Sequence, residues 1–414
     1  MRSATHPLIL VPKRASSWVQ RSAYAHRVRI GILTREWPPE IYGGAGVHVD
    51  QLVHQLKQHT PVYVHCFGGH RTDAIAHPVP ASLHEANPAL QTLGVDLEMA
   101  MALSDVDLVH SHTWYTNFAG HTASLLYGIP HVITAHSLEP LRPWKEDQLG
   151  GGYRLSSWLE RTSYAEAKAV IAVSNGMRND VLSAYPFVEP ERVHVVHNGI
   201  DTSIYTPDSA TSTLKEFGIN LNKPYVLFVG RITRQKGLIH LLRAAKNFEG
   251  NIPLVMCASA ADTPEIEVEI AQAVEELREA RGHDSVIWIE KQVPRATLIQ
   301  LFSHARAFLC PSIYEPLGIV NLEAMACETA VIASDVGGIP EVVSNGTTGM
   351  LVHYNAEDPA KFEHDFAQAV NSLVGDSDRA KAMGKAGRKR AVQSFSWDAI
   401  AEQTLSVYRT AMDL

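Results

Sequence analysis

Two successive series of short apolar runs constrain the fold of this chain more than any other feature. In the first series, segments with helical spacing (48–59 and 114–127) separate strand-length runs: VRIGILT (28–34), PVYVHCF (61–67), VDLVHSHT (106–113), HVITAHS (131–137), AVIAVS (169–174) and VHVVHNG (193–199). Runs that are apolar throughout, instead of alternating with polar residues, are typical of parallel strands covered on both faces. Their alternation with helices predicts an α/β domain built on a parallel sheet.

The pattern starts again after segment 201–223, which is polar, contains no strand signal and is predicted to link two domains. The second series comprises YVLFVGRI (225–232), PLVMCAS (253–259), SVIWIE (285–290), RAFLCPS (306–312) and AVIASDV (330–336). We predict two doubly wound Rossmann-like domains, 27–205 and 206–395, and a C-terminal helix in 396–414 that crosses back to the first domain. The domains are expected to face each other across a cleft lined by the carboxyl ends of both sheets, where ligands bind.

Composition excludes several classes of protein. The net charge of −8 argues against a nucleic acid partner, and no apolar run approaches the ~20 residues that would cross a membrane. Four cysteines without CxxC spacing predict reduced thiols in a cytoplasmic protein. Residues 1–26 carry basic but no acidic side chains and no long apolar stretch, so we expect a disordered or mis-annotated extension there.

The segment YEPLGIVNLEAM (314–325) is the strongest local signal for a ligand site. A helix that opens near Gly318 would present the amides of Leu317, Gly318 and Ile319 to a diphosphate, because helix N-termini bind anions. Glu323 would lie roughly 7–8 Å further along the axis, where a carboxylate can accept the hydroxyls of a ribose. Glu315 would face the sugar. The alternative is that Glu315 caps the helix and Glu323 is a solvated surface acid.

The segment VGRITRQKG (229–237) follows the first strand of the second series and contains two cations. Arg231 and Lys236 would point into the cleft and stabilise the negative charge of a departing nucleoside diphosphate. A solvated basic turn is the alternative interpretation.

Two features of the first domain are candidates for the donor site. In PPEIYGGAG (38–46), Gly43, Gly44 and Gly46 would let the backbone approach a ligand closely, or would form a plain tight turn. His136 ends a strand at the edge of the cleft, where it could donate to a hydroxyl of the donor sugar. The loop is not GxGxxG and no ribose-binding acid follows the next strand, which disfavours a nicotinamide-linked oxidoreductase.

Two motifs resemble metal sites. Asp105-Val106-Asp107 matches a DxD pattern, and His110 and His112 would share one face of a strand. The sequence suggests no third ligand nearby, the aspartates begin a strand, and Arg231 with Lys236 already provides positive charge. We therefore predict no metal and no other cofactor.

Taken together, these motifs resemble glycosyltransferase family 4, whose members have the GT-B fold. The hallmarks are Glu315-x7-Glu323, the segment from Gly230 to Gly237, and DVGGIPE (335–341). Longer segments, LTREWPPEIYGGAGVHV and ITAHSLEPLRPWK among them, are similar to the actinobacterial-type glycogen synthases, a group that includes α-maltose-1-phosphate synthases. The similarity runs from about Val28 to Tyr408.

The resemblance implies a retaining transfer of glucose from ADP-glucose or another nucleoside diphosphate glucose, forming an α-1,4 bond in glycogen or α-glucan synthesis without metal. It implies that Arg231 and Lys236 bind the diphosphate, Glu323 the ribose, and Glu315 and His136 the donor sugar. The longer bacterial synthases carry a lysine before the paired glycines, whereas this chain has Tyr42. No phosphate-binding role of that lysine can be carried over.

The sequence leaves the acceptor open. A glucose 1-phosphate acceptor would need a positive pocket, for which Arg142, Lys145 and Arg154 are candidates unless they are solvated loop charges. A glucan end would instead need aromatic platforms, provided by Trp114, Tyr115 or Trp144. A family 4 transferase with another sugar acceptor and a non-catalytic sugar-nucleotide-binding protein are the alternative functions. A homodimer also stays open, because the sequence does not determine the oligomeric state.

Overall fold

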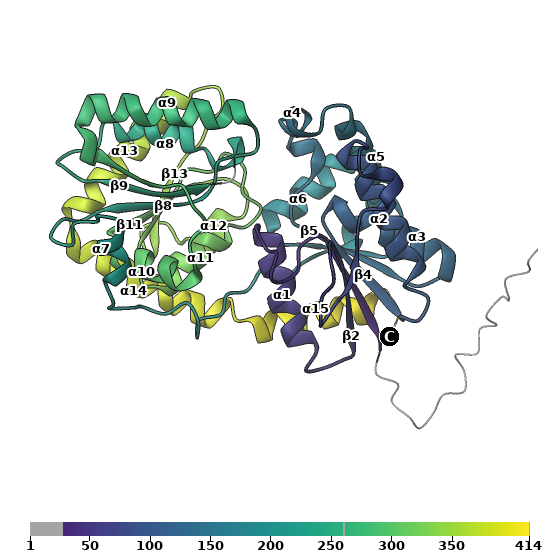
Figure 1. The fold of residues 1–414 in the computed structure, drawn as a ribbon. Helices are drawn as coiled ribbons and strands as arrows, with labels where there is room; N and C mark the ends of the chain where they lie inside the picture. Colours follow the sequence, from purple (N-terminus) through teal and green to yellow (C-terminus); the bar gives the residue numbers. More distant parts are fainter. Residues whose placement is uncertain (1–27, 260, 414) are drawn as a thin grey trace, which may run out of the picture.

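The computed structural model describes residues 28–259 and 261–413, with the side chains of 147 and 148 left aside, and it contains two parallel β-sheets. The extension expected in 1–26 lies outside the described residues. Figure 1 shows the two domains side by side, each a sheet with helices on both faces. The prediction of two doubly wound domains is confirmed. No helix in the described ranges is long and apolar enough to cross a membrane.

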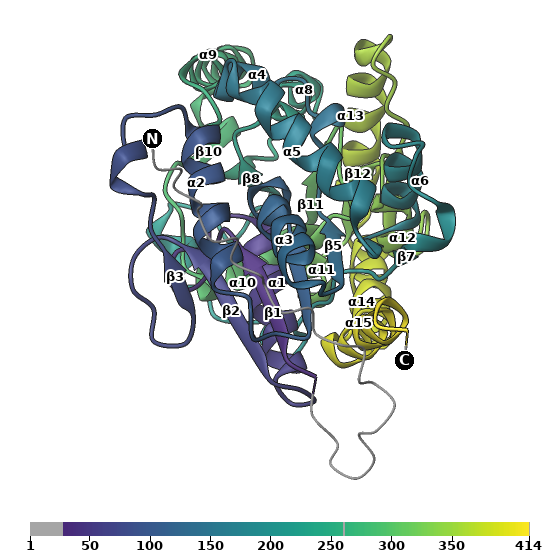
Figure 2. The same cartoon turned by 90° about the vertical axis from the view of Figure 1, so that its right-hand side faces the viewer.

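The first domain contains a seven-stranded sheet in the order β3-β2-β1-β4-β5-β6-β7. Its strands are β1 (Ile30–Thr34), β2 (Val62–Phe67), β3 (Ile75–His77), β4 (Leu108–His112), β5 (His131–Ala135), β6 (Ala169–Ala172) and β7 (Val193–Val195). Its helices are α1 (Gly44–Leu56), α2 (Pro88–Met101), α3 (Trp114–Tyr127), α4 (Lys145–Leu149), α5 (Gly152–Glu166) and α6 (Asn175–Ala184). Helices α2, α3 and α5 lie together on one face, toward the viewer in Figure 2.

The second domain contains a six-stranded sheet in the order β10-β9-β8-β11-β12-β13. Its strands are β8 (Val226–Arg231), β9 (Leu254–Ser259), β10 (Val286–Ile289), β11 (Ala307–Cys310), β12 (Val331–Ser334) and β13 (Gly349–Val352). The helices from here to the C-terminus are α7 (Ser212–Glu216), α8 (Leu238–Ala245), α9 (Pro264–Arg281), α10 (Arg295–His304), α11 (Ile319–Ala326), α12 (Ile339–Val342), α13 (Pro359–Gly375), α14 (Ser377–Ser394) and α15 (Trp397–Ala411).

Each sheet has a topological switch point at its centre. Strand β1 pairs with both β2 and β4, and strand β8 pairs with both β9 and β11, all in parallel. The connections that leave β1 and β4, like those that leave β8 and β11, therefore diverge to opposite sides of the sheet. Because ligands of open α/β sheets bind where the strand order reverses, these four loops should carry the functional groups.

The C-terminal helix α15 crosses back to the first domain, as predicted. Its first residue, Trp397, and its last turn near Tyr408 pack with α1 and the first sheet in one buried cluster. The yellow segment in Figure 1 shows this return. The Tyr408 hydroxyl also lies 2.7 Å from His110 Nδ1 on β4, while His110 Nε2 lies 2.6 Å from Thr134 Oγ1. His110 therefore joins α15 to two neighbouring strands.

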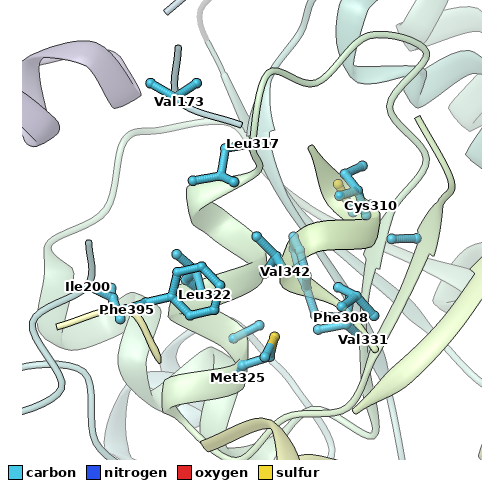
Figure 3. Close-up of a cluster of buried hydrophobic side chains, with 14 of the residues drawn as sticks. Val173, Ile200, Phe308, Cys310, Leu317, Leu322, Met325, Val331, Val342 and Phe395 are labelled. Carbon is cyan, nitrogen blue, oxygen red and sulfur yellow. The ribbon is translucent and has the colours of Figure 1, made fainter. Parts of the chain in front are cut away.

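A shared hydrophobic core lies beneath the helix that opens near Gly318. Figure 3 shows Leu317 and Leu322 of the second domain beside Val173 and Ile200 of the first, with Phe395 closing the group. All five side chains are buried. The position of α11 relative to the first domain is thus fixed by packing. The four cysteines are buried and free, as the sequence indicated.

Candidate active site

Lys236 and Glu315 meet at the switch point of the second sheet. Lys236 ends the single helical turn after β8, and Glu315 lies in the loop after β11. Lys236 Nζ lies 2.6 Å from Glu315 Oε2, which also accepts from Ser312 Oγ at 3.2 Å. Burial alone would lower the pKa of Lys236, but the carboxylate outweighs burial and raises it. Neither the solvated basic turn nor a helix-capping Glu315 describes this pair, so both alternatives are wrong.

Arg231 ends β8 and forms an ion pair with Asp262, their charged atoms 3.1 Å apart. Lys145 of the first domain lies close enough to this pair for both charges to act on it. Burial, and then the charge of neighbouring Arg142, lowers the pKa of Lys145 to about 8, with Asp262 opposing and Arg231 adding to the shift. The structure thus brings together three cations predicted for donor and acceptor, Arg231, Arg142 and Lys145.

Arg142 and Lys145 are buried, only 9% and 4% exposed, so they are not the solvated loop charges of the alternative interpretation. Arg142 donates to Ser137 Oγ at 3.1 Å, which ties it to the loop after His136. Trp144, between them in the chain, packs edge-on against Tyr314 of the second domain. Arg154 is exposed on α5, and its predicted role stays a prediction.

The helix predicted to hold a diphosphate is α11. Gly318 stands before its first residue with φ 94°, a conformation that favours glycine, and no side chain caps the helix. Glu323, in the second turn, is 8% exposed and accepts from the Tyr205 hydroxyl at 2.8 Å. Burial raises the pKa of Glu323 to about 7. A solvated surface acid is therefore the wrong interpretation of Glu323.

The glycine segment at the start of α1 binds the side chain of Glu36, a residue that the sequence did not indicate. Its carboxylate accepts from the amides of Tyr42 and Gly43 at 2.9 and 2.8 Å. A Cβ at Gly46 would lie 2.6 Å from the same carboxylate, so this glycine makes room for Glu36. A Cβ at Gly44 would instead lie 3.6 Å from Ile319 Cδ1, which places Gly44 opposite the start of α11.

The aromatic candidates in the first domain differ in exposure. Trp114, the first residue of α3, is 2% exposed in a cluster with residues of α2, α4 and α5, so it is not available as a sugar platform and that prediction is wrong. Tyr115 is half-buried, with the Arg35 guanidinium 4.1 Å from its ring centroid. Arg35, which the sequence analysis missed, also faces Tyr42 at 5.9 Å. Tyr42 itself is 49% exposed.

His136 directly follows β5, as predicted, and is half-buried. Its Nε2 lies 2.9 Å from Nδ1 of His112, and His48 of α1 completes a group of three imidazoles. The expectation that no third possible ligand lies near His112 is wrong, because strand order and α1 bring residues 48 and 136 to it. The DxD segment is structural, since Asp107 accepts from Arg29 at 3.1 Å.

The motif 335–341 forms hydrogen bonds to the loop that carries Glu315 and to the first domain. Gly338 donates from its amide to the carbonyl of Glu315 at 3.0 Å. The Glu341 carboxylate accepts from the amides of Asn175 and Gly176 at the start of α6, both at 3.0 Å, and lies 2.9 Å from His197 Nε2. This motif therefore couples the placement of Glu315 to the contact between the domains.

The site brings together cations after β8 and β5, the start of α11 without a side-chain cap, and buried carboxylates, and comparison with known proteins agrees with it. Residues 42–204 match the family model described as Glycosyltransferase Family 4, and residues 210–390 match Glycosyl transferases group 1. The chain is 58% identical over 386 residues to the α-maltose-1-phosphate synthase of Mycolicibacterium smegmatis, covering 92% of this chain and 99% of that protein. The chain is a family 4 glycosyltransferase.

Solved structures give the same fold for this glycosyltransferase. Sucrose-phosphate synthase from Thermosynechococcus elongatus superposes with a TM-score of 0.76 at 22% identity, covering 94% of this chain and all, 100%, of that one. Anabaena HepE, in complex with UDP and glucose, superposes with a TM-score of 0.75 at 19% identity, covering 93% and 100%. The predicted GT-B fold is confirmed.

Proposed function

We propose that this family 4 glycosyltransferase moves a glucosyl unit from ADP-glucose, or another nucleoside diphosphate glucose, onto glucose 1-phosphate with retention, forming an α-1,4 bond. The observation that carries the proposal is the pair of buried cations, Arg142 and Lys145, opposite Arg231. The similarity to an α-maltose-1-phosphate synthase supports the same product.

On the donor side, each predicted residue has a task that its position supports. Arg231 and Lys236 hold the diphosphate, together with the amides at the start of α11. Glu323 accepts the ribose hydroxyls, and its buried position makes that recognition specific. Glu315 and His136 contact the glucose from opposite domains.

In the reaction, the bond between C1 of glucose and the diphosphate oxygen breaks, and the nucleoside diphosphate leaves with the electron pair. The acceptor O4 attacks C1 from the same face, and its proton passes to the departing phosphate oxygen. The fixed cations Arg231 and Lys236 stabilise the charge that develops on the leaving group. No side chain forms a covalent intermediate in this reaction. Arg231 and Lys236 provide the positive charge beside the leaving group, without a metal or another cofactor.

On the acceptor side, charge distinguishes the two candidates. Arg142 and Lys145 lie with Arg231 at one place, and a group of fixed positive charges attracts an anionic ligand. A sugar phosphate provides that anion, whereas the end of a glucan does not. Trp114 and Arg35 cover the ring of half-buried Tyr115, so Tyr115 would offer its hydroxyl and ring edge to the acceptor.

Product analysis with two competing acceptors tests the proposal. We expect ADP-glucose, glucose 1-phosphate and glycogen together to yield mainly a phosphorylated disaccharide. Arg142→Gln should raise the KM for glucose 1-phosphate by about 10²-fold, as truncating a buried charge contact does. Arg161→Gln, at an exposed arginine on α5, is the matched control and should leave that KM unchanged. Arg154→Gln decides whether that residue contributes.

The other outcomes identify the alternatives. Elongated glucan as the main product would contradict glucose 1-phosphate as the acceptor and would favour a glycogen synthase instead. Binding of the donor without release of nucleoside diphosphate to any acceptor would favour a non-catalytic binding protein.

A further inference from the structure

Three histidines from separate elements converge beside the cleft. His48 lies on α1, His112 at the end of β4, and His136 after β5; one nitrogen from each lies within 4.8 Å of the others. The ring centroids are 4.8 Å (His48–His136), 5.2 Å (His112–His136) and 5.6 Å (His48–His112) apart. We call these residues the histidine cluster.

The histidine cluster has hydrogen-bonding capacity that the protein does not use. His48 is 3% exposed, yet within residues 28–259 and 261–413 neither of its ring nitrogens has a hydrogen-bond partner, and the same holds for His112 Nε2. A hydrogen bond with nearby Asn198 can satisfy one nitrogen of His48, which still leaves the other His48 nitrogen and His112 Nε2 without a partner among the described residues. The ring nitrogens of buried histidines normally have hydrogen-bond partners. Both ring nitrogens of His110, on the same strand as His112, have one. Such an excess of unused nitrogen atoms needs an explanation.

The imidazoles are also in the form that binds metals. Burial lowers the pKa of His48 to about 4 and the pKa values of His112 and His136 well below their usual range. A neutral imidazole has a free lone pair, and three such rings with an open fourth position are a ligand set that Zn²⁺ takes.

We propose that the histidine cluster is a binding site for a late first-row transition metal ion such as Zn²⁺, reached from the cleft past half-buried His136. Zinc–nitrogen bonds of about 2.0–2.1 Å require ligand atoms about 3.4 Å apart in a tetrahedron. Because the ligand atoms of the histidine cluster lie within 4.8 Å of one another, the most distant pair has to close by at most about 1.4 Å. The hydrogen bond between His112 Nδ1 and His136 Nε2, 2.9 Å long, keeps these two rings side by side, and a metal ion that binds there replaces the proton they share. Only His48 then has to turn toward them.

The metal would inhibit the enzyme. His136 is the residue placed against the donor sugar, and a metal ion on its ring would remove it from that role. This consequence rests on the proposed function, whereas metal binding itself does not.

Cobalt provides a direct probe, because Co²⁺ in a tetrahedral nitrogen site absorbs visible light much more strongly than hydrated Co²⁺. Titration of the full chain with Co²⁺ should give these bands at one ion per chain, and Zn²⁺ should displace them. His48→Asn should abolish the bands. His65→Asn is the matched control, since His65 is a buried histidine 3.0 Å from His77 Nε2 in the same domain, outside the cluster. Circular dichroism establishes that both variants are folded.

Inhibition is the second readout. Zn²⁺ should inhibit the wild type and the His65→Asn variant equally. At least about 10–100-fold more Zn²⁺ should be needed for His48→Asn, because even the loss of a residue that only supports a ligand costs that much in metal affinity. The proposal is overturned if wild-type protein shows no bands, or if both variants bind Co²⁺ like the wild type. Bands without transferase activity in any sample would refute the proposed function and leave the metal site standing.

Discussion

The pair Lys236–Glu315 allows the donor-site account to be tested by separating stability from catalysis. We consider Lys236→Met, which keeps an unbranched stem but removes the charge. In the wild type the ammonium lies 2.6 Å from a carboxylate whose side chain is only 9% exposed, with Ser312 as its other partner. The variant therefore leaves a nearly buried, uncompensated carboxylate.

Two magnitudes follow. Breaking a fully buried ion pair costs about 3–5 kcal/mol, and the Lys236 side chain is 22% exposed, so solvent screening reduces our expectation to about 2–3 kcal/mol of unfolding free energy. Independently, the loss of one fixed charge at a leaving group should lower kcat by about 10²–10³-fold. Urea denaturation followed by tryptophan fluorescence measures the first, and the initial rate of nucleoside diphosphate release measures the second.

The double variant Lys236→Met with Glu315→Gln distinguishes the roles. It removes the uncompensated charge, so it should regain stability to within about 1 kcal/mol of the wild type while activity stays low. Wild-type turnover in Lys236→Met would refute the diphosphate assignment. Recovery of activity in the double variant would show that Lys236 serves only to neutralise Glu315.

Three further predictions concern other charged groups. Glu323→Gln keeps an acceptor for the Tyr205 hydroxyl but loses the charge, so the KM for the donor should rise about tenfold with kcat changed less than threefold; equal loss in both would contradict ribose binding. The pKa of Lys145 is about 8, so its charge is present at pH 7 and lost by pH 9, and the KM for glucose 1-phosphate should rise over that range. Arginine keeps its charge at pH 9, so a Lys145→Arg variant that still shows the rise would contradict deprotonation of Lys145 as the cause. Burial would raise the pKa of Glu341, but the amides of α6 outweigh burial and lower this pKa, so the carboxylate stabilises the fold near neutrality and loses this effect as pH falls below about 4.5. Glu341→Gln should lower the free energy of unfolding by about 1–2 kcal/mol at pH 7 and enlarge the radius of gyration measured by small-angle scattering. An unchanged radius would refute a role of Glu341 in holding the domains together.

Much of the fold follows from local sequence. The apolar run 28–34 predicts β1, and the helical spacing predicts the bounds of α3 (Trp114–Tyr127) as observed. Two edge strands were missed, Ile75–His77 and Gly349–Val352. Each lies in a segment rich in polar residues and turn formers, DAIAHP (73–78) and NGTTGMLVHY (345–354), so neither stands out as an apolar run. The linker contains no strand, as predicted, but its polar residues include the short helix α7.

The site was predictable only where one segment carries the whole signal. Glu315 and Glu323 share a loop and a helix, so spacing alone indicated their neighbourhood. Contacts between segments far apart in the chain were not predictable, because they depend on strand order and side-chain direction. Glu341 and Asn175 are 166 residues apart in the chain, and Tyr205 and Glu323 are 118 residues apart.

The central claim is the transfer of glucose, with retention, to a phosphorylated sugar, and NMR of the purified product tests it most directly. ADP-glucose labelled with ¹³C at C1 of glucose is incubated with unlabelled glucose 1-phosphate. The account predicts that the labelled carbon becomes an α-anomeric carbon bonded to O4 of a sugar that still carries phosphate. A β-anomeric label would contradict retention, and free labelled glucose or label only in a phosphate-free glucan would contradict the proposed acceptor.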